Sequence, residues 1–145
     1  MSREVLGGPM VAYVESWSGP PQYGLGGPPD CGTRVYVRDL DSGRLMHDLP
    51  SGIKLQPHPS GCEGVGPIEA LVTKSDGAVA WIASDWLRRI ALGLPYPRYF
   101  DLYAAEASGE RLVASGTGIS PRSLSLAGST LYWTQEGKPM SATLD

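Results

Sequence analysis

Two stretches, ALVTKSDGAVAW at residues 70–81 and RSLSLAGSTLYW at residues 122–133, decide the fold. They align without a gap at an offset of 52 residues, and Trp81 matches Trp133. Each stretch has an apolar run, a turn, and a second apolar run that ends in an aromatic residue. Runs of this length around a Gly-containing turn pair predict β-hairpins. The sequence therefore contains a hairpin that repeats.

A looser third copy lies at the N-terminus. At an offset of 68 residues, the run Val11–Tyr13 matches Val79–Trp81. Pairs of small or turn-forming residues mark the three predicted turns: Gly7 and Gly8, Asp76 and Gly77, and Gly128 and Ser129. Three hairpins are expected.

A second unit follows the first two hairpins. VYVRDLDSGRLMHDL at residues 35–49 and FDLYAAEASGERLVAS at residues 100–115 each have an extended run, a Ser-Gly turn and a shorter run. A block of four strands is thus predicted twice, and a third block that begins at residue 122 has three strands and lacks its fourth. The predicted strands lie near residues 3–6, 10–16, 34–40, 44–49, 69–74, 78–84, 99–106 and 110–115.

The fold class predicted from these patterns is all-β, in a single domain over residues 1–145. The 19 glycines and 13 prolines are scattered between apolar runs, which indicates many tight turns and argues against a helical bundle. One short helix is expected in a loop near residues 85–92, where Asp85 would cap a turn with apolar residues on one face and Pro95 would stop it.

The four-strand block resembles a blade of the TolB-type or WD-like β-propellers. The likeness rests on VAYVES with VYVRDLDSGRL, and on TKSDGAVAWIAS with FDLYAAEASGERL. A weaker similarity links the chain to the C-terminal part of secreted actinobacterial propeller-like proteins of unassigned function. The resemblance implies a propeller-like array of antiparallel four-stranded blades, with blade 1 at about 3–49, blade 2 at about 69–115 and a partial blade 3 at about 122–144.

The predicted array is incomplete, because propellers close with typically four to eight blades. Three interpretations are open: a fragment of a longer protein, copies that assemble into a ring, or an open stack or sandwich. An open array leaves strand edges that invite pairing with another chain, so edge pairing or homo-oligomerisation is a predicted partner mode.

Charge and hydropathy restrict the partners. The net charge is −3, and no run of Lys or Arg offers a footprint for nucleic acid. No stretch reaches the roughly 18 apolar residues of a membrane span. The first residues, MSREVLGGPMVAYVESW, lack the order of a signal peptide. An extracellular or cell-envelope location is favoured only if the chain belongs to a longer exported protein.

The functional surface is expected on the side of the long loops. If the blade order holds, the long loops at residues 17–32, 50–67 and 85–98 share one face, whereas the opposite face has only two-residue turns. Aromatic side chains there could stack on a sugar or anchor a protein, and an arginine pair could receive a carboxylate. Covering the sheet ends and solvated charge are the competing roles for these candidate binding residues: Trp17, Tyr23, Trp86, Tyr96, Arg88 and Arg89.

Cys31 and Cys62 would lie on the same face, which leaves a disulfide or two separate thiols as the alternatives. A disulfide between them would stabilise the fold by about 3–4 kcal/mol in the chain-entropy model.

The sequence contains no motif for catalysis, metal binding or a cofactor. His47 and His58 have no convergent partners, and neither GxSxG, HExxH nor a phosphate-binding loop occurs. The predicted function is therefore a non-enzymatic binding module for a protein or a glycan, with no cofactor. The alternatives are a terminal structural fragment of a larger secreted propeller and a non-catalytic piece of a hydrolase.

Overall fold

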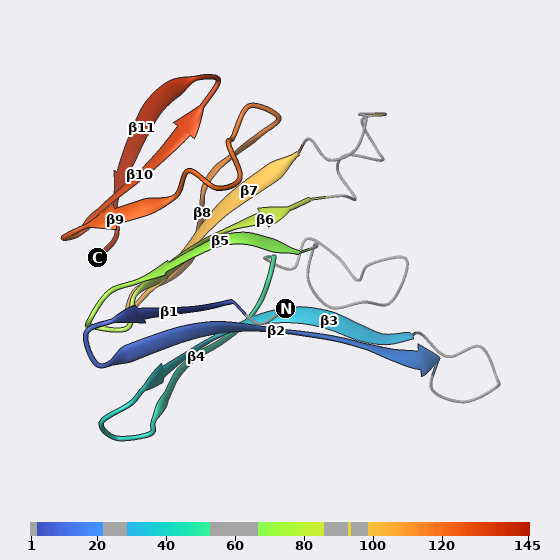
Figure 1. Ribbon diagram of the computed structural model, residues 1–145, viewed down its shortest axis with the longest axis vertical. Helices are drawn as coiled ribbons and strands as arrows, with labels where there is room; N and C mark the ends of the chain where they lie inside the picture. The colour runs from blue at the N-terminus through green and yellow to red at the C-terminus, as the bar shows by residue number, and fades with distance from the viewer. Residues whose placement is uncertain (1–2, 22–28, 53–66, 86–92, 94–98) are drawn as a thin grey trace.

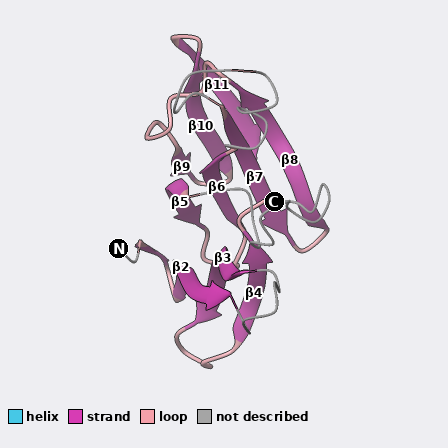
Figure 2. Cartoon of the chain, turned by 90° about the vertical axis from the view of Figure 1, so that its right-hand side faces the viewer, coloured by secondary structure: helices cyan, strands magenta, loops and turns pink. Residues whose placement is uncertain are grey.

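The computed structural model describes residues 3–21, 29–52, 67–85, 93 and 99–145, and of residues 18–21 and 29–31 the backbone alone. Within these ranges the regular structure is entirely β-strand, in three antiparallel sheets (Figures 1 and 2). Sheet A contains β1 (Glu4–Gly7), β2 (Met10–Pro21), β3 (Pro29–Asp39) and β4 (Leu45–Pro50). Sheet B contains β5 (Ile68–Thr73), β6 (Val79–Ser84), β7 (Phe100–Glu106) and β8 (Gly109–Gly116). Sheet C contains β9 (Ser125–Ala127), β10 (Thr130–Gln135) and β11 (Lys138–Thr143).

Every sheet is a meander, in which neighbours in sequence are neighbours in the sheet. Tight turns make this possible: Gly8, with φ of 57°, begins the turn between β1 and β2, and Gly128, with φ of 59°, begins the turn between β9 and β10. Such left-handed φ angles are unfavourable for side chains with a Cβ, which explains glycine at both places.

The three sheets stack face to face, with sheet B in the middle. One core cluster joins sheets A and B, and a second joins sheets B and C. All residues of β6 and β7 are buried, because both faces of these strands are covered. Their nearly continuous apolar runs, VAWIAS and FDLYAAE, have the composition that a strand buried on both faces requires.

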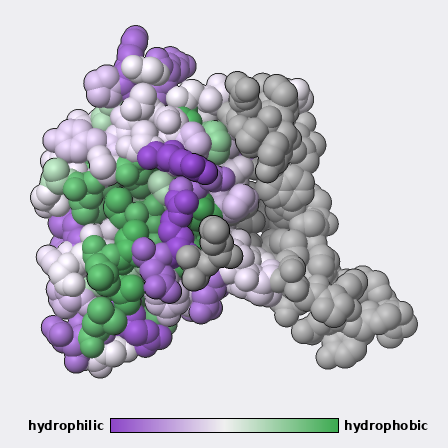
Figure 3. All heavy atoms as spheres, in the orientation of Figure 1, coloured by the Kyte–Doolittle hydropathy of each residue, from purple (hydrophilic) through white to green (hydrophobic). Residues whose placement is uncertain are grey.

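The sheets meet along their first strands. In sheet B, β5 contacts β1 and β2 of sheet A on one side and β9 of sheet C on the other. The side of the stack formed by these first strands is partly apolar. Figure 3 shows hydrophobic side chains gathered over β1 and β5, near the hairpin turns.

The turn between the first and second strand lies at the same end of the stack in all three sheets, so the stack has two distinct ends. At the short-turn end lie the β1–β2, β3–β4, β5–β6, β7–β8 and β9–β10 turns, on the left of Figure 1. At the opposite end, called here the long-connection end, lie the strand ends that lead from β2 to β3, from β4 to β5, from β6 to β7 and from β8 to β9. The C-terminus lies at the short-turn end (Figure 1).

The predicted all-β class and the order of eleven strands in blocks of four, four and three are confirmed. Within the described ranges no sheet closes on itself. The predicted loop at residues 17–32 was too long, because the β2–β3 ladder continues through Trp17↔Gly32 and Ser18↔Cys31. A hydroxyl contact of 3.1 Å between Ser16 and Thr33 supports this extension.

Two further expectations concerned the turns at the short-turn end and a short helix. The short-turn end does not have two-residue turns only, since residues 40–44 and 74–78 form five-residue connections. In both, an aspartate side chain accepts backbone N–H groups that a tighter turn would have paired: Asp39 from Asp41, and Asp76 from Ala78. The helix predicted near 85–92 lies, apart from Asp85, outside the described residues.

Candidate functional site

Buried polar side chains gather at the long-connection end. Of the buried polar residues in the described part of the chain, four lie there: Ser51, Ser84, Asp85 and Asp101. Asp101, near the start of β7, is fully buried, and Asp85, just after β6, is 4% exposed. Burial of a carboxylate is unfavourable without hydrogen bonds or a charge partner. Two buried carboxylates at this end therefore indicate that polar groups are arranged around each of them.

Hydrogen bonds connect this end into a framework. Trp81 Nε1 donates to the carbonyl of Ser51 over 2.8 Å, which joins β6 of sheet B to the residue after β4 of sheet A. The Tyr103 hydroxyl donates to Asp101 Oδ2 over 3.0 Å. The Asp85 amide donates to the Tyr99 carbonyl over 2.9 Å, so the two sides of the β6–β7 connection are held together. The strand ends that carry the long connections are thus fixed.

Of the residues predicted to bind a ligand, Trp17 is described, and it lies within β2, half-buried. Tyr23, Trp86, Arg88, Arg89 and Tyr96 lie outside the described residues. The structure therefore places Trp17 on the same end of the stack as Asp85 and Asp101, and the other candidates stay predictions.

The predicted disulfide is not tested either. Cys31 lies in β3, paired with Ser18, but its side chain is outside the described part, as is Cys62. The pairing stays a prediction.

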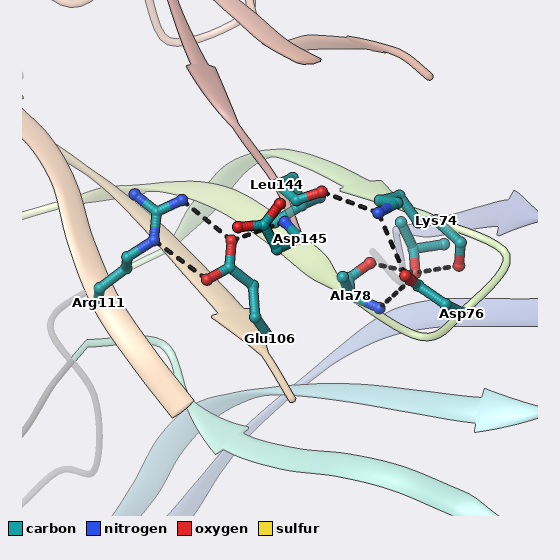
Figure 4. A network of polar contacts seen from close by, with 8 residues as sticks. Lys74, Asp76, Ala78, Glu106, Arg111, Leu144 and Asp145 are labelled. Atoms are coloured by element: carbon teal, nitrogen blue, oxygen red, sulfur yellow. Dashed lines mark hydrogen bonds and ion pairs between the residues drawn. The ribbon is translucent and has the colours of Figure 1, made fainter. Parts of the chain in front are cut away.

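The short-turn end holds a polar network that sequence patterns did not reveal (Figure 4). Lys74 Nζ donates to the carbonyl of Leu144 over 2.8 Å and pairs with Asp76 Oδ2 at 3.2 Å. Arg111 binds both carboxylate oxygens of Glu106, at 3.0 and 3.2 Å. The amide of Asp145 donates to Glu106 Oε1 over 2.9 Å. These bonds tie the residues after β11 to sheet B.

Electrostatics follow from this geometry. The bonded Arg111 guanidinium lowers the pKa of the Glu106 carboxyl, against the opposing effect of burial, and the Asp145 amide lowers this pKa further. Glu106 in turn raises the pKa of Arg111. The Ala78 amide and Lys74 lower the pKa of Asp76. The charged forms are favoured, so this network is a structural clamp with no group poised for proton transfer.

An aromatic pair lies on the side of sheet A that faces away from sheet B. The rings of Tyr13 and Tyr36 stack at 5.2 Å with an interplanar angle of 20°. Desolvation raises the pKa of Tyr36, and the Asp48 and Glu15 carboxylates raise it further. Arg34 Nε binds Asp48 Oδ1 at 2.6 Å beside them. The sequence contained a sign of this pair, since Tyr13 matches the buried Trp81 in the repeat.

Searches for relatives give no guide to the site. Neither a known protein family, a curated protein nor a solved structure matches this chain. Within the described ranges, no three His, Cys, Asp or Glu residues lie so that they could hold a metal ion. In the same ranges there is no helix with the length and apolarity to cross a membrane.

Proposed function

We propose that this chain is a propeller-like, non-enzymatic binding module whose ligand surface lies at the long-connection end. The observation that carries the proposal is the concentration of buried polar side chains there, with Ser51, Asp85 and Asp101 at or beside the described strand ends. Buried carboxylates are unfavourable unless hydrogen bonds or charges are organised around them, as Arg111 and the Asp145 amide are around Glu106 at the short-turn end.

The arrangement of the sheets supports the propeller-like part of the proposal. Antiparallel four-stranded meanders stack face to face and meet along their first strands, as blades arranged around an axis would. In such an array the connections between blades and those between second and third strands share one end. Loops carried on a rigid scaffold are the usual place for binding residues.

The ligand expected at this surface is an extended glycan or peptide. Trp17 is half-buried at the rim, and the predicted aromatic and arginine residues, Tyr23, Trp86, Tyr96, Arg88 and Arg89, belong to the connections that start from these strand ends. Aromatic rings suit stacking on sugars or anchoring of a peptide side chain.

Binding to immobilised oligosaccharide and peptide arrays tests the proposal. A ligand found there should bind Trp86→Ala and Tyr23→Ala at least about tenfold more weakly, since an aromatic anchor contributes on the order of 1.4 kcal/mol or more. The thermal midpoint should hold. Leu112→Ala, at an exposed position of β8 in sheet B, is the control and should bind normally. Equal binding by all three variants, or no binding to either array, contradicts the proposal.

A further inference from the structure

The two sides of each sheet differ in a way that repeats through the stack. In sheet B, Trp81 and Tyr103 pair across β6 and β7, with ring centroids 5.6 Å apart, and face sheet A, where they are 0% and 2% exposed. In sheet C, Trp133 faces sheet B. The side directed toward the preceding sheet is therefore aromatic.

The opposite side of sheets A and B carries mostly small or aliphatic residues, with Phe100 of β7 as an aromatic exception. Ala12 and Val14 of sheet A share a core cluster with Trp81, and Ala80 and Ile82 of sheet B share one with Trp133. Bulky rings of one sheet thus pack on small side chains of its neighbour, which fills the space between them.

Sheet A carries the same aromatic pair on its outward side. Tyr13 and Tyr36 are paired across β2 and β3, as Trp81 and Tyr103 are across β6 and β7, and both ring pairs are in contact. We call the outward side of sheet A the outer A face. Alternation along the strands assigns to it Glu4, Leu6, Val11, Tyr13, Glu15, Trp17, Arg34, Tyr36, Arg38 and Asp48. Leu6 on β1 is 71% exposed.

Sheet C has the complementary outward side, called here the outer C face. The same alternation assigns to it Ser125, Ala127, Thr130, Tyr132, Thr134, Pro139, Ser141 and Thr143. It carries no charge. It is the side that would meet a following sheet, and Tyr132 and Thr134 occupy the repeat positions of Ala80 and Ile82.

We propose that two copies of this chain associate by packing the outer C face of each on the outer A face of the other. Two copies supply six sheets, within the range of about four to eight at which stacked blades close into a ring. Both contacts are identical, and closure leaves no sheet face open. The inference rests on the observed stacking and on the two outward faces, and its test needs no ligand; Trp17 is the one described residue that the outer A face shares with the proposed ligand surface.

Both arginines of the outer A face stay paired in this contact, whereas the carboxylates of Glu4 and Glu15 need hydrogen bonds from the hydroxyls of the outer C face. Arg34 is bound to Asp48 at 2.6 Å, and Arg38 Nη1 donates to the carbonyl of Gly43 over 2.7 Å, so covering these residues leaves both arginines paired. The neutral hydroxyl-rich outer C face can bond the remaining polar groups. Because hydroxyls replace the alanine and isoleucine of the internal contacts, the association is weaker than the internal packing and depends on concentration.

Sedimentation velocity of the full chain from about 1 to 200 μM tests the association. The expected result is a shift from the 15.4 kDa chain to a species of twice that mass. Tyr36→Glu on the outer A face and Tyr132→Glu on the outer C face should each raise the dissociation constant at least tenfold. The matched control, Leu112→Glu on β8, changes an exposed residue on neither face and should dimerise normally.

Other outcomes overturn the proposal. They are a monomer at all concentrations, species that grow beyond two copies, and dimers broken by Tyr36→Glu but not by Tyr132→Glu, which would mean that two outer A faces pair. Nitration of the unmodified chain is a second measurement that does not depend on the variants folding. Tyr36 and Tyr132 should lose reactivity together as concentration rises, with buried Tyr103 as the unreactive reference. Loss at one of the two positions alone contradicts the contact.

Discussion

Leu131 links the smallest sheet to the rest of the molecule. It is 0% exposed in β10 and belongs to the cluster between sheets B and C, with Ala80 and Leu102. Truncation to alanine removes three buried carbons and leaves a cavity, so Leu131→Ala is expected to lower the unfolding free energy by about 2–5 kcal/mol. Urea denaturation measures the change. Leu112→Ala, at a position 44% exposed, should change it by at most about 0.5 kcal/mol; equal effects would mean that sheet C does not pack on sheet B as described.

Glu106 is expected to give stability a dependence on acid pH. Its folded pKa is lowered below the ordinary glutamate value of 4.5, chiefly by the Arg111 hydrogen bonds. The stabilisation is therefore complete above the unfolded pKa and is lost as the pH falls through the lower folded pKa. Glu106→Gln should cost about 1.5–3 kcal/mol at neutral pH, the range for hydrogen bonds to charged groups.

The pH dependence separates Glu106 from the other carboxylates. Asp76 and Asp39 also have lowered pKa values, so the unmodified chain alone cannot assign the acid transition. The difference in unfolding free energy between the unmodified chain and Glu106→Gln should shrink as the pH falls below 4.5. A difference that stays constant down to pH 3 would show that the clamp works without the charge of Glu106.

At the scale of elements, β1 approaches the end of β5 so closely that a side chain cannot fit between them. A Cβ on Gly7 would overlap the carbonyl oxygen of Thr73. Gly7→Ala should therefore destabilise the chain by about 1–3 kcal/mol, as overpacking does. Gly128→Asn is the control, because its turn position has open space and a φ of 59° that asparagine tolerates. Thermal denaturation that ranks the control below Gly7→Ala would contradict the close packing of sheets A and B.

The edge of β11 that faces away from β10 offers few free backbone groups for pairing with another strand. In the hairpin that joins β10 to β11, alternate residues of β11, beginning with Pro139, direct their backbone groups away from β10. Pro139 has no N–H to offer a further strand, and the carbonyl of Thr143 already accepts a hydrogen bond from Arg111 Nη2. Proline and occupied backbone groups discourage edge pairing. Contact through sheet faces is therefore favoured over the edge pairing expected from the missing strand.

The elements themselves were predictable because their determinants are local. Apolar runs of strand length between Gly-containing turns defined β5, β6, β9 and β10 to within a few residues. The extension of β2 and β3 was not predictable, because Gly, Pro and Ser in WSGPPQYG favour turns locally whereas pairing across the ladder holds the strand. The clamp was also missed. Lys74 and Leu144 are 70 residues apart in the sequence, and no local sequence pattern predicts a contact over that separation.

For the whole molecule, the repeat predicted a shared block but not how the blocks pack. The match of Tyr13, Trp81 and Trp133 predicted equivalent positions in their strands. The packing of the sheets buries Trp81 and Trp133, whereas Tyr13 lies on the outward side of sheet A. The sequence predicted a functional surface at the long loops, and this location stays a prediction. The sequence indicated only a helix cap at Asp85 and no role for Asp101, because burial depends on the neighbouring sheet and not on the adjacent sequence.

The order of the sheets predicts how the stack opens. In a single copy, the described part of sheet B shares a core with both neighbours, whereas sheets A and C each share only one, so at concentrations where the chain is monomeric the amides of β6 and β7 should exchange with solvent most slowly. Hydrogen exchange followed by mass spectrometry should rank β6 and β7 slowest and β9 and β11 fastest, since β11 has five exposed residues of six. In Leu131→Ala, exchange should accelerate in β9–β11 while β1–β4 keep their rates. If sheet A accelerates equally, the two cores unfold as one cooperative unit and the independent opening of sheet C is wrong.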